Sequence, residues 1–412
     1  MVLWSKVDKC RICKSSINPL FDFGSLSLTG VFLENGKDVE KAPIVFGHCS
    51  NCGLHQLMHN FQQAELYGPT YGYESHLNSQ MRSHLESKAK LLEKTYLQPT
   101  NSRILDIASN DGTFLTFFST KVLKYGIDPL IRSVGDYYPK ESFKIIDFFS
   151  SKVVLGATNG QLFDLVTSNS VLYDVDSPVD FAKDVASVLN ENGIWHFEQS
   201  YLSSMIDTMS IDTICHEHLL YLSASQINVL LEEAGFGILN VSLNEVNGGS
   251  IAITAIKSKN KYSNSFFEFL MKKEKNEGYF SDDKAIDFFQ RSLTFRESFT
   301  RLLEEYIESG TAIFGVGAST KGNMLLQFCG LDASVISEIG EINPKKFGKQ
   351  TPGSAIPISQ ESALFDQMSK KKSIGVVFPW HFRNSIRKAA VNYISRGGAL
   401  LYPLPRIEIE SI

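Results

Sequence analysis

From Arg103 onward, short apolar runs alternate with amphipathic stretches, and this alternation limits the chain to a small set of folds. The runs that predict buried strands are ILDI (104–107), YGID (125–128), KII (144–146), FDLVTS (163–168) and GIWHFE (193–198). Residues 181–189 have a helical pattern of apolar positions. Strands that alternate with helices favour an α/β fold, in which helices cover both faces of a parallel sheet.

A second set of buried strands lies toward the C-terminus. The runs TAIFGVG (311–317), SVISEI (334–339), SIGVVF (373–378) and GALLYPL (398–404) predict another α/β unit. A polar stretch at 257–265 and a helical pattern at 266–309 separate the two units. We therefore predict a small N-terminal module at 1–65, a Rossmann-like domain at 66–258, a helical bridge at 259–309 and a second Rossmann-like α/β domain at 310–412.

The composition is that of a globular protein and excludes several classes of partner. Of 412 residues, 43% are hydrophobic and 21% are charged, which is enough apolar mass for two or three cores. The net charge of −5 leaves no basic excess to neutralise phosphates, so we expect no nucleic-acid partner. Because no run has the length of a membrane span or a signal-peptide core, we expect a cytoplasmic monomer or small homo-oligomer without membrane contact.

Four of the six cysteines form two CxxC pairs, one at Cys10 and Cys13 and the other at Cys49 and Cys52. In a reducing compartment this pattern favours a metal over disulfides. The four thiolates can enclose a tetrahedral Zn²⁺, and a closed shell without water indicates a structural site. Two unrelated pairs, or a redox pair, are the alternatives. Three nearby histidines could each replace a thiolate: His48, His55 and His59.

The segment ILDIASNDGTFL (104–115) predicts a nucleotide-binding loop. It runs from a strand through small residues, which let a ligand approach the backbone, into a predicted helix whose N-terminus offers free N–H groups. Asp111 argues against a phosphate loop, and the GxGxxG of a dinucleotide fold is absent. Asp128 ends the next strand, where a carboxylate can accept hydrogen bonds from ribose hydroxyls. These features fit S-adenosylmethionine, and a tight turn in any Rossmann-like fold is the alternative.

Collinear motifs extend over nearly the whole chain. They are both CxxC pairs, YGYES (71–75), the DIASNDGTFL loop with GIDP (126–129), DTICHEHL (212–219), NGGS (247–250), GASTKGN (317–323), PG (352–353) and GG…PLP (397–405). In these motifs the chain resembles the zinc-containing, S-adenosylmethionine-dependent sugar C-methyltransferases, which act on nucleotide-linked 4-keto-6-deoxysugars. The resemblance implies that the first domain binds zinc, the second binds S-adenosylmethionine and the third helps to hold the sugar nucleotide. The predicted cofactor-binding residues are Asp106, Ala108, Ser109, Asn110, Gly112, Asp128, Ser168 and Asn169.

The implied reaction is methylation at carbon, at C3 with either TDP or GDP as the nucleotide. A sugar carbon becomes a nucleophile only when a base removes a proton next to a ketone and a donor holds the enolate oxygen. His218 is the predicted base, and Glu217 beside it could orient the imidazole. Tyr71 or Tyr73 could donate to the sugar.

The turn at 315–322 lies between a predicted strand and a predicted helix, where it could cradle an anion with Lys321 in reach of a phosphate. Alternatively, the last domain only packs against the rest. The predicted substrate-binding residues are His216, Asn247, Lys321 and Asn323. His216 and His218 could instead hold a metal with Glu217 or Asp212, or could both be structural histidines.

The chain departs from the family pattern at three positions. Cys215 stands where the family has tyrosine, Asp174 where it has a histidine after the fourth strand, and Ala252 where it has arginine. These departures leave the cofactor unchanged and leave the acceptor open. The alternatives are therefore methyl transfer to oxygen or nitrogen on a related sugar nucleotide, or a non-catalytic protein that binds nucleotide-sugars.

Overall fold

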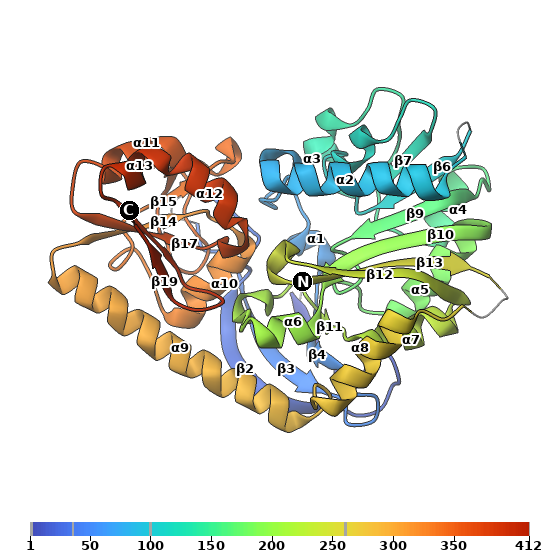
Figure 1. Cartoon of the computed structure of the whole chain (residues 1–412), viewed down its shortest axis with the longest axis horizontal. Helices are drawn as coiled ribbons and strands as arrows, with labels where there is room; N and C mark the ends of the chain where they lie inside the picture. Colours follow the sequence, from blue (N-terminus) through green and yellow to red (C-terminus); the bar gives the residue numbers. More distant parts are fainter. Residues whose placement is uncertain (1–2, 35–36, 99–100, 259–261, 412) are drawn as a thin grey trace.

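The computed structural model describes residues 3–34, 37–98, 101–258 and 262–411 (Figure 1). The first three residues of the predicted helical bridge, 259–261, lie outside this part of the chain. The described residues form four β-sheets, of two, four, six and seven strands. The C-terminal six-stranded unit lies to one side of the other sheets, and the long helix α9 (Asp282–Glu308) runs beneath both parts (Figure 1).

The N-terminal module consists of antiparallel sheets, although its sequence predicts little regular structure. One sheet has the order β11-β4-β3-β2, and β1 pairs with β5. In β2, the pairing register shifts twice and Gly24 has a φ of 74°, so bulges interrupt the alternation that would reveal the strand. The strands are β1 (Trp4–Lys6), β2 (Asn18–Ser27), β3 (Lys41–His48), β4 (His55–Leu57), β5 (His59–Phe61) and β11 (Leu220–Tyr221).

The central sheet confirms the predicted α/β fold and corrects one detail of it. Its order is β12-β13-β10-β9-β6-β7-β8. β13 runs antiparallel to both of its neighbours, so the sheet is not wholly parallel as the sequence pattern predicts. The reason is the short turn at 245–249, because so few residues can join only antiparallel strands. The strands are β6 (Arg103–Ile107), β7 (Leu123–Ile127), β8 (Phe143–Ile145), β9 (Phe163–Asn169), β10 (Leu189–Ser200), β12 (Phe236–Asn244) and β13 (Ser250–Lys257).

Helices pack on both faces of this sheet. Helix α2 (Ser79–Tyr96) begins at Asn78, whose side chain accepts a hydrogen bond from the amide of Met81 at 2.9 Å. The buried stripe of α2 belongs to the same apolar cluster as Ile104 and Leu165 of the sheet. Phe181 of α5 packs near Trp195 with ring centroids 6.1 Å apart. The other helices here are α1 (Gln63–Leu66), α3 (Ile131–Val134), α4 (Ser151–Ala157), α5 (Pro178–Val188), α6 (Leu202–Asp207) and α7 (Ala224–Glu233).

Two helices follow the central sheet, as the helical pattern predicts. They are α8 (Ser265–Asn276) and α9 (Asp282–Glu308). Ser281 caps α9, because its hydroxyl accepts a hydrogen bond from the amide of Lys284 at 3.2 Å. Phe289 of α9 stacks on Phe21 of β2 with centroids 4.4 Å apart. None of the helices in the described residues is long and apolar enough to cross a membrane.

The C-terminal sheet has the order β16-β15-β14-β17-β18-β19 and is parallel except for β19. The predicted strand at 334–339 begins only at Ile339, because Asp332 holds the preceding residues in a turn and accepts hydrogen bonds from the amides of Ser334 and Ile336. The elements are β14 (Ala312–Val316), α10 (Thr320–Cys329), β15 (Ile339–Glu341), β16 (Ile358–Gln360), α11 (Glu361–Met368), β17 (Ser373–Val377), α12 (Arg383–Ala389), α13 (Val391–Ser395), β18 (Ala399–Tyr402) and β19 (Glu408–Glu410).

Candidate active site and metal centre

The two CxxC turns have the same backbone geometry. The amide of Lys14 donates to the carbonyl oxygen of Cys10 at 3.0 Å, and the amide of Gly53 donates to that of Cys49 at 2.8 Å. Lys14 and Gly53 both have a positive φ, 62° and 74°. Each turn therefore reverses the chain directly after its second cysteine.

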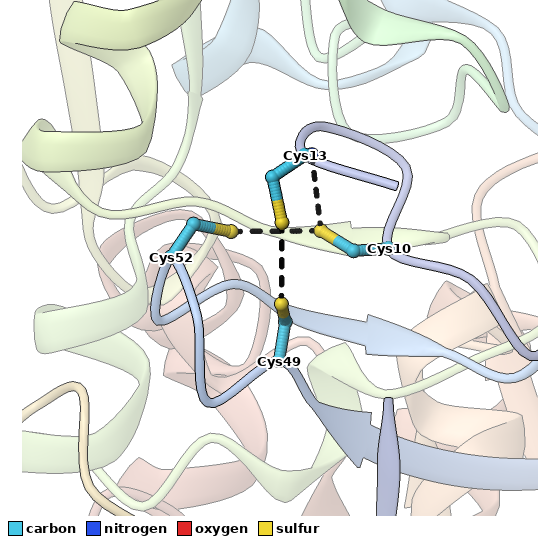
Figure 2. Close-up of side chains that lie close together, drawn as sticks. All are labelled: Cys10, Cys13, Cys49 and Cys52. Atoms are coloured by element: carbon cyan, nitrogen blue, oxygen red, sulfur yellow. Dashed lines mark hydrogen bonds between the residues drawn. The ribbon is translucent and has the colours of Figure 1, made fainter. Parts of the chain in front are cut away.

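The four thiols converge between these turns (Figure 2). The Sγ atoms of Cys10 and Cys52 are 3.5 Å apart, those of Cys13 and Cys49 are 3.4 Å apart, and all four lie within 4.8 Å of one another. These distances exclude disulfides, whose sulfurs are about 2.05 Å apart. A tetrahedral zinc with Zn–S bonds of about 2.3 Å separates its sulfurs by roughly 3.8 Å. The thiol set therefore fits zinc, and a closed shell makes the site structural.

The nearby histidines are not part of this cluster. His48 Nδ1 lies 2.5 Å from a carboxylate oxygen of Asp282, and the ring of His55 stacks on that of His48. Within the described residues, the four thiols are the only group of three or more potential metal ligands. That observation gives no support to the alternative of a second metal at His216 and His218.

The predicted cofactor loop follows β6 in a left-handed conformation. Ala108 and Asn110 have φ values of 53° and 51°, and Gly112 has a φ of 80°. Asp128, at the end of β7, holds the loop: one carboxylate oxygen accepts from the amide of Asn110 at 2.8 Å, and the other from that of Leu130 at 2.7 Å. The helix predicted after the loop is only a 3₁₀ turn, Phe114–Phe117. The predicted helix N-terminus with its free N–H groups is therefore absent at this position.

Two buried carboxyl groups border this loop. Asp106 accepts a hydrogen bond from the hydroxyl of Thr167 at 2.6 Å, and burial raises the pKa of Asp106 to about 7. Burial also raises the pKa of Asp128. A cationic ligand would favour ionisation of both groups. The pair therefore suits a ligand that carries positive charge as well as hydroxyl groups.

The segment before α2 covers the loop. The amide of Ser75 donates to Asn110 Oδ1 at 3.1 Å, and Asn110 Nδ2 donates to the carbonyl oxygen of Tyr73 at 3.2 Å. His76 makes two contacts with one oxygen of Asp111, each at 2.8 Å, through its amide and its ring Nδ1. The asparagine and aspartate of the loop thus hold the tyrosine segment against the predicted cofactor loop.

A single cavity of about 570 Å³ joins the three parts of the molecule. It lies among the cofactor loop, the tyrosine segment, the DTICHEHL segment and the ends of β14, β15 and β17. A cavity of this size suits a ligand of moderate size or two smaller ones. The predicted site residues that line it are Tyr71, Tyr73, Asp106, Ala108, Ser109, Asn110, Asp128, Asn169, Glu217, His218, Asn247 and Lys321.

Two predicted cofactor residues support the cavity from behind instead of lining it. Gly112 packs directly against the ring of Tyr138, where a Cβ atom would overlap the ring. The hydroxyl of Ser168 accepts a hydrogen bond from the indole N–H of Trp195 at 3.0 Å. Both residues act on the shape of the loop and the sheet, and their contact with a cofactor stays a prediction.

Two predicted substrate residues are likewise outside the cavity lining. His216 is fully buried, with Nε2 3.0 Å from the carbonyl oxygen of Ala42 and the ring edge-on to Phe61. Asn323 Nδ2 donates to the carbonyl oxygen of Thr29 at 2.7 Å. These side chains join the N-terminal sheet to the other parts, as structural residues do.

His218 has the geometry of a base. Its Nδ1 lies 2.6 Å from the carbonyl oxygen of Thr213, so Nδ1 carries the hydrogen and Nε2 has the free lone pair. Burial and the nearby Lys321 ammonium lower the pKa of His218 to about 3. The imidazole is therefore neutral at pH 7, and the lowered pKa makes it a weak base until a ligand offsets the charge of Lys321.

Lys321, near the N-terminus of α10, carries a buried positive charge at the cavity wall. Its Nζ donates to the hydroxyl of Thr213 at 3.0 Å and to the carbonyl oxygen of Asn247 at 2.5 Å. Burial lowers the pKa of Lys321, and the nearby Asp212 carboxylate opposes that shift. An anionic ligand would compensate the same charge.

Several cavity residues are not among the residues predicted from the sequence. Tyr173 lies beside His218 with ring centroids 4.3 Å apart, and His381 and Lys346 line the C-terminal side. Each of these residues follows the carboxyl end of a strand, namely β9, β17 and β15. Because ligands of α/β folds bind at that edge of the sheet, this position is a signal that could have identified all three residues.

Comparison with known proteins finds matches along most of the chain. Three family models match in succession: "Putative zinc binding domain" over residues 10–67, "Methyltransferase domain" over 73–241 and "C-methyltransferase C-terminal domain" over 245–405. C-methyltransferase NovU from Streptomyces niveus is 25% identical over 413 residues, which span 98% of this chain and 97% of that protein. The chain belongs to the C-methyltransferase family.

This methyltransferase uses S-adenosylmethionine and carries zinc. Similar solved structures include N-methyltransferase NodS from Bradyrhizobium japonicum in complex with S-adenosylhomocysteine, at 15% identity and a TM-score of 0.33 over 44% of this chain and 88% of that one. Another is magnesium protoporphyrin IX methyltransferase from Synechocystis PCC 6803 with bound S-adenosylmethionine, at 14% identity and a TM-score of 0.33 over 43% and 79%.

Proposed function

We propose that this methyltransferase adds a methyl group to C3 of a nucleotide-linked 4-keto-6-deoxysugar. The observation that supports this proposal most is the position of His218. A neutral imidazole, with its free nitrogen set by the bond to Thr213, lines the same cavity as the cofactor loop. Transfer to oxygen or nitrogen needs no carbon acid, whereas transfer to carbon needs a neutral base at the acceptor. An anionic sugar nucleotide near Lys321 would raise the pKa of His218 and strengthen it as that base.

In the proposed reaction, His218 removes the proton from the carbon next to the ketone. The electrons of that C–H bond form an enolate, whose carbon then bonds to the methyl group. The bound cofactor supplies that methyl group as an electrophile. The enolate oxygen needs a donor, and the thiol of Cys215 is a weak one. Tyr71 lines the cavity with a pKa well above its usual value because of burial, so its hydroxyl remains protonated and can donate.

The cofactor occupies the half of the cavity that Asp106, Asn110 and Asp128 line. In this proposal Asp128 accepts hydrogen bonds from the ribose, and the turn from Ala108 to Gly112 lies against the methionine end. The nucleotide of the sugar lies toward α10, where Lys321 pairs with a phosphate oxygen. The phosphate of the substrate would thus supply the counter-charge of the buried Lys321 ammonium.

Asp128→Ala is expected to weaken S-adenosylmethionine binding at least about tenfold, because the variant loses a carboxylate contact worth about 1.5–3 kcal/mol. Titration calorimetry measures the change. Asp128→Asn serves as a comparison, since it retains an acceptor for the amide of Asn110 and separates the loss of the loop bond from the loss of charge. Unchanged affinity in Asp128→Ala would place the cofactor elsewhere.

The function itself is tested by incubating the enzyme and cofactor with TDP- and GDP-linked 4-keto-6-deoxysugars. Mass spectrometry detects the methylated product, and a carbon–proton correlation spectrum locates the methyl group. We expect a new methyl on a quaternary carbon or on a carbon next to the ketone. A methyl on oxygen or nitrogen would establish the alternative transfer, and binding of both ligands without product would indicate a non-catalytic protein.

A further inference from the structure

A lysine interrupts the apolar face of helix α2. The residues that this helix buries are Met81, Leu85, Lys88, Ala89 and Leu92. Lys88 lies in the middle of this stripe and is only 8% exposed. Burial lowers the pKa of Lys88, because it disfavours the charged ammonium. Since a lysine is rarely buried unless it is paired, the contacts of its Nζ indicate what it does.

The ammonium of Lys88 connects two strands of the central sheet. Its Nζ lies 2.9 Å from Glu198 Oε1, near the end of β10, and donates a hydrogen bond at 2.9 Å to Asn169 Oδ1, at the end of β9. Glu198 has further partners: His84 Nε2 lies 2.7 Å from Oε1, and Asn244 Nδ2 donates to Oε2 at 2.8 Å. Burial would raise the pKa of Glu198, but Lys88 and His84 lower it to about 2. The ionised carboxylate therefore holds the ammonium in place.

The bond from Lys88 determines which atom of the Asn169 amide can face the cavity. Asn169 lines the cavity, whereas Lys88 is not among the described residues of its lining. An ammonium can only donate, so the amide oxygen points to Lys88 and the amide nitrogen is left to face a ligand as a donor. A carbonyl that accepts from a cation also polarises its amide, which strengthens the N–H groups as donors. Lys88 thus acts on the cavity through Asn169.

Asn169 lies on the same side of the central sheet as Asp106. The hydroxyl of Thr167 donates to Asp106 at 2.6 Å, and Asn169 follows Thr167 by two residues, so both side chains project from one face of β9. Burial raises the pKa of Asp106, and the Lys88 ammonium acts in the opposite direction. A carboxyl and an amide donor therefore lie at the carboxyl ends of the paired strands β6 and β9. An amino-acid zwitterion carries the complementary groups, an ammonium and a carboxylate.

We propose that Asn169 Nδ2 donates a hydrogen bond to the carboxylate at the methionine end of the cofactor, and that Lys88 is a positioning residue that holds the amide in this orientation. The inference rests on the proposed position of the cofactor and is independent of the sugar. The α-amino group of the cofactor lies toward Asp106. Because Glu198 neutralises the ammonium, α2 directs a donor at the carboxylate without adding net positive charge near the sulfonium.

The test compares two ligands that differ only in this carboxylate: S-adenosylhomocysteine and its decarboxylated analogue, which retains the amine. Titration calorimetry measures the affinity of each. We expect the wild-type enzyme to bind S-adenosylhomocysteine at least about tenfold more tightly, the effect of one hydrogen bond to a charged group. Lys88→Met and Asn169→Ala are each expected to remove most of this preference. Lys90→Met, which removes an exposed lysine from the same helix, should retain it.

Two double variants separate positioning from folding and from direct contact. Lys88→Met/Asn169→Ala should lose no more of the preference than Asn169→Ala alone, because Lys88 acts through the amide. Lys88→Met/Glu198→Gln removes both charges of the buried ion pair, so it avoids an unpaired carboxylate and should show the same loss as Lys88→Met. Thermal unfolding of each variant confirms that the protein is folded.

Loss of the preference in both the Lys88 and the Asn169 variants would support the inference. Equal affinities in the wild type, an unchanged preference in Asn169→Ala or in the Lys88 variants, additive losses, or equal weakening of both ligands would each overturn it. Asp128→Ala distinguishes this failure from that of the proposed function, since it should weaken both ligands alike. Unchanged affinity in Asp128→Ala would contradict the proposed position of the cofactor itself.

Discussion

Replacing His218 with alanine is expected to lower kcat for methyl transfer by about 10²–10⁴-fold, the usual contribution of a general base. The effect is large because His218 is the proposed base. The bond from its Nδ1 to the carbonyl oxygen of Thr213 fixes the ring and leaves Nε2 free to take the proton. Product formation under saturating cofactor and sugar nucleotide measures it.

The same variant should bind S-adenosylmethionine with unchanged affinity, since the cofactor loop is held by Asp128 and Asn110 and not by His218. That measurement separates lost chemistry from lost structure. His218→Gln, which retains a polar side chain without a base, should be as inactive as His218→Ala. Turnover near the wild-type rate in either variant would remove His218 from the mechanism.

Loss of the zinc site is expected to have the largest effect on stability. Structural zinc in small domains binds with apparent free energies of about 10–16 kcal/mol, and that energy is coupled to folding. Cys10→Ser should therefore lower the zinc content below one ion per chain and reduce the free energy of unfolding by several kcal/mol. Metal analysis of tag-free protein, together with thermal unfolding, measures both quantities.

Cys329→Ser is the matched control for this experiment. Cys329 is a buried free thiol on α10, outside the cysteine cluster, so its replacement tests the effect of a serine in a core without touching the metal. We expect a loss of about 1–3 kcal/mol with unchanged zinc content. Equal destabilisation of the two variants, or wild-type protein without zinc, would contradict a structural zinc site.

The sequence predicted those features that depend on local spacing. Two CxxC pairs specify four thiols whatever the fold between them, and the acids at the ends of β6 and β7 mark a ligand edge because parallel strands align their carboxyl ends. The α/β class followed from apolar periodicity. Strand β2 was not predicted because its bulges and Gly24 interrupt the alternation of apolar and polar residues. The antiparallel direction of β13 was not predicted because it depends on the short turn after β12, which apolar periodicity does not indicate.

Contacts between distant segments could not be predicted in the same way. Thr29 and Glu217 are far apart in the chain, and only the fold shows that the Thr29 hydroxyl donates to Glu217 Oε2 at 3.0 Å beside the cavity that Glu217 lines. Likewise, His216 lies in a motif typical of a functional site. Its ring instead contacts the carbonyl oxygen of Ala42 and joins the N-terminal sheet to the DTICHEHL segment. Motifs therefore locate the region of a site, and tertiary contacts decide which side chains face the ligand.

The central claim, that a carbon of the sugar becomes the nucleophile, is tested most directly by hydrogen exchange in D₂O. Proton removal by His218 requires no methyl donor, so the enzyme with S-adenosylhomocysteine in the cofactor site should replace one carbon-bound hydrogen of the keto-sugar nucleotide with deuterium. Mass and proton spectra should show this exchange in the wild-type enzyme and its loss in His218→Ala. Methylated product from an enzyme that exchanges no carbon-bound hydrogen would contradict the account.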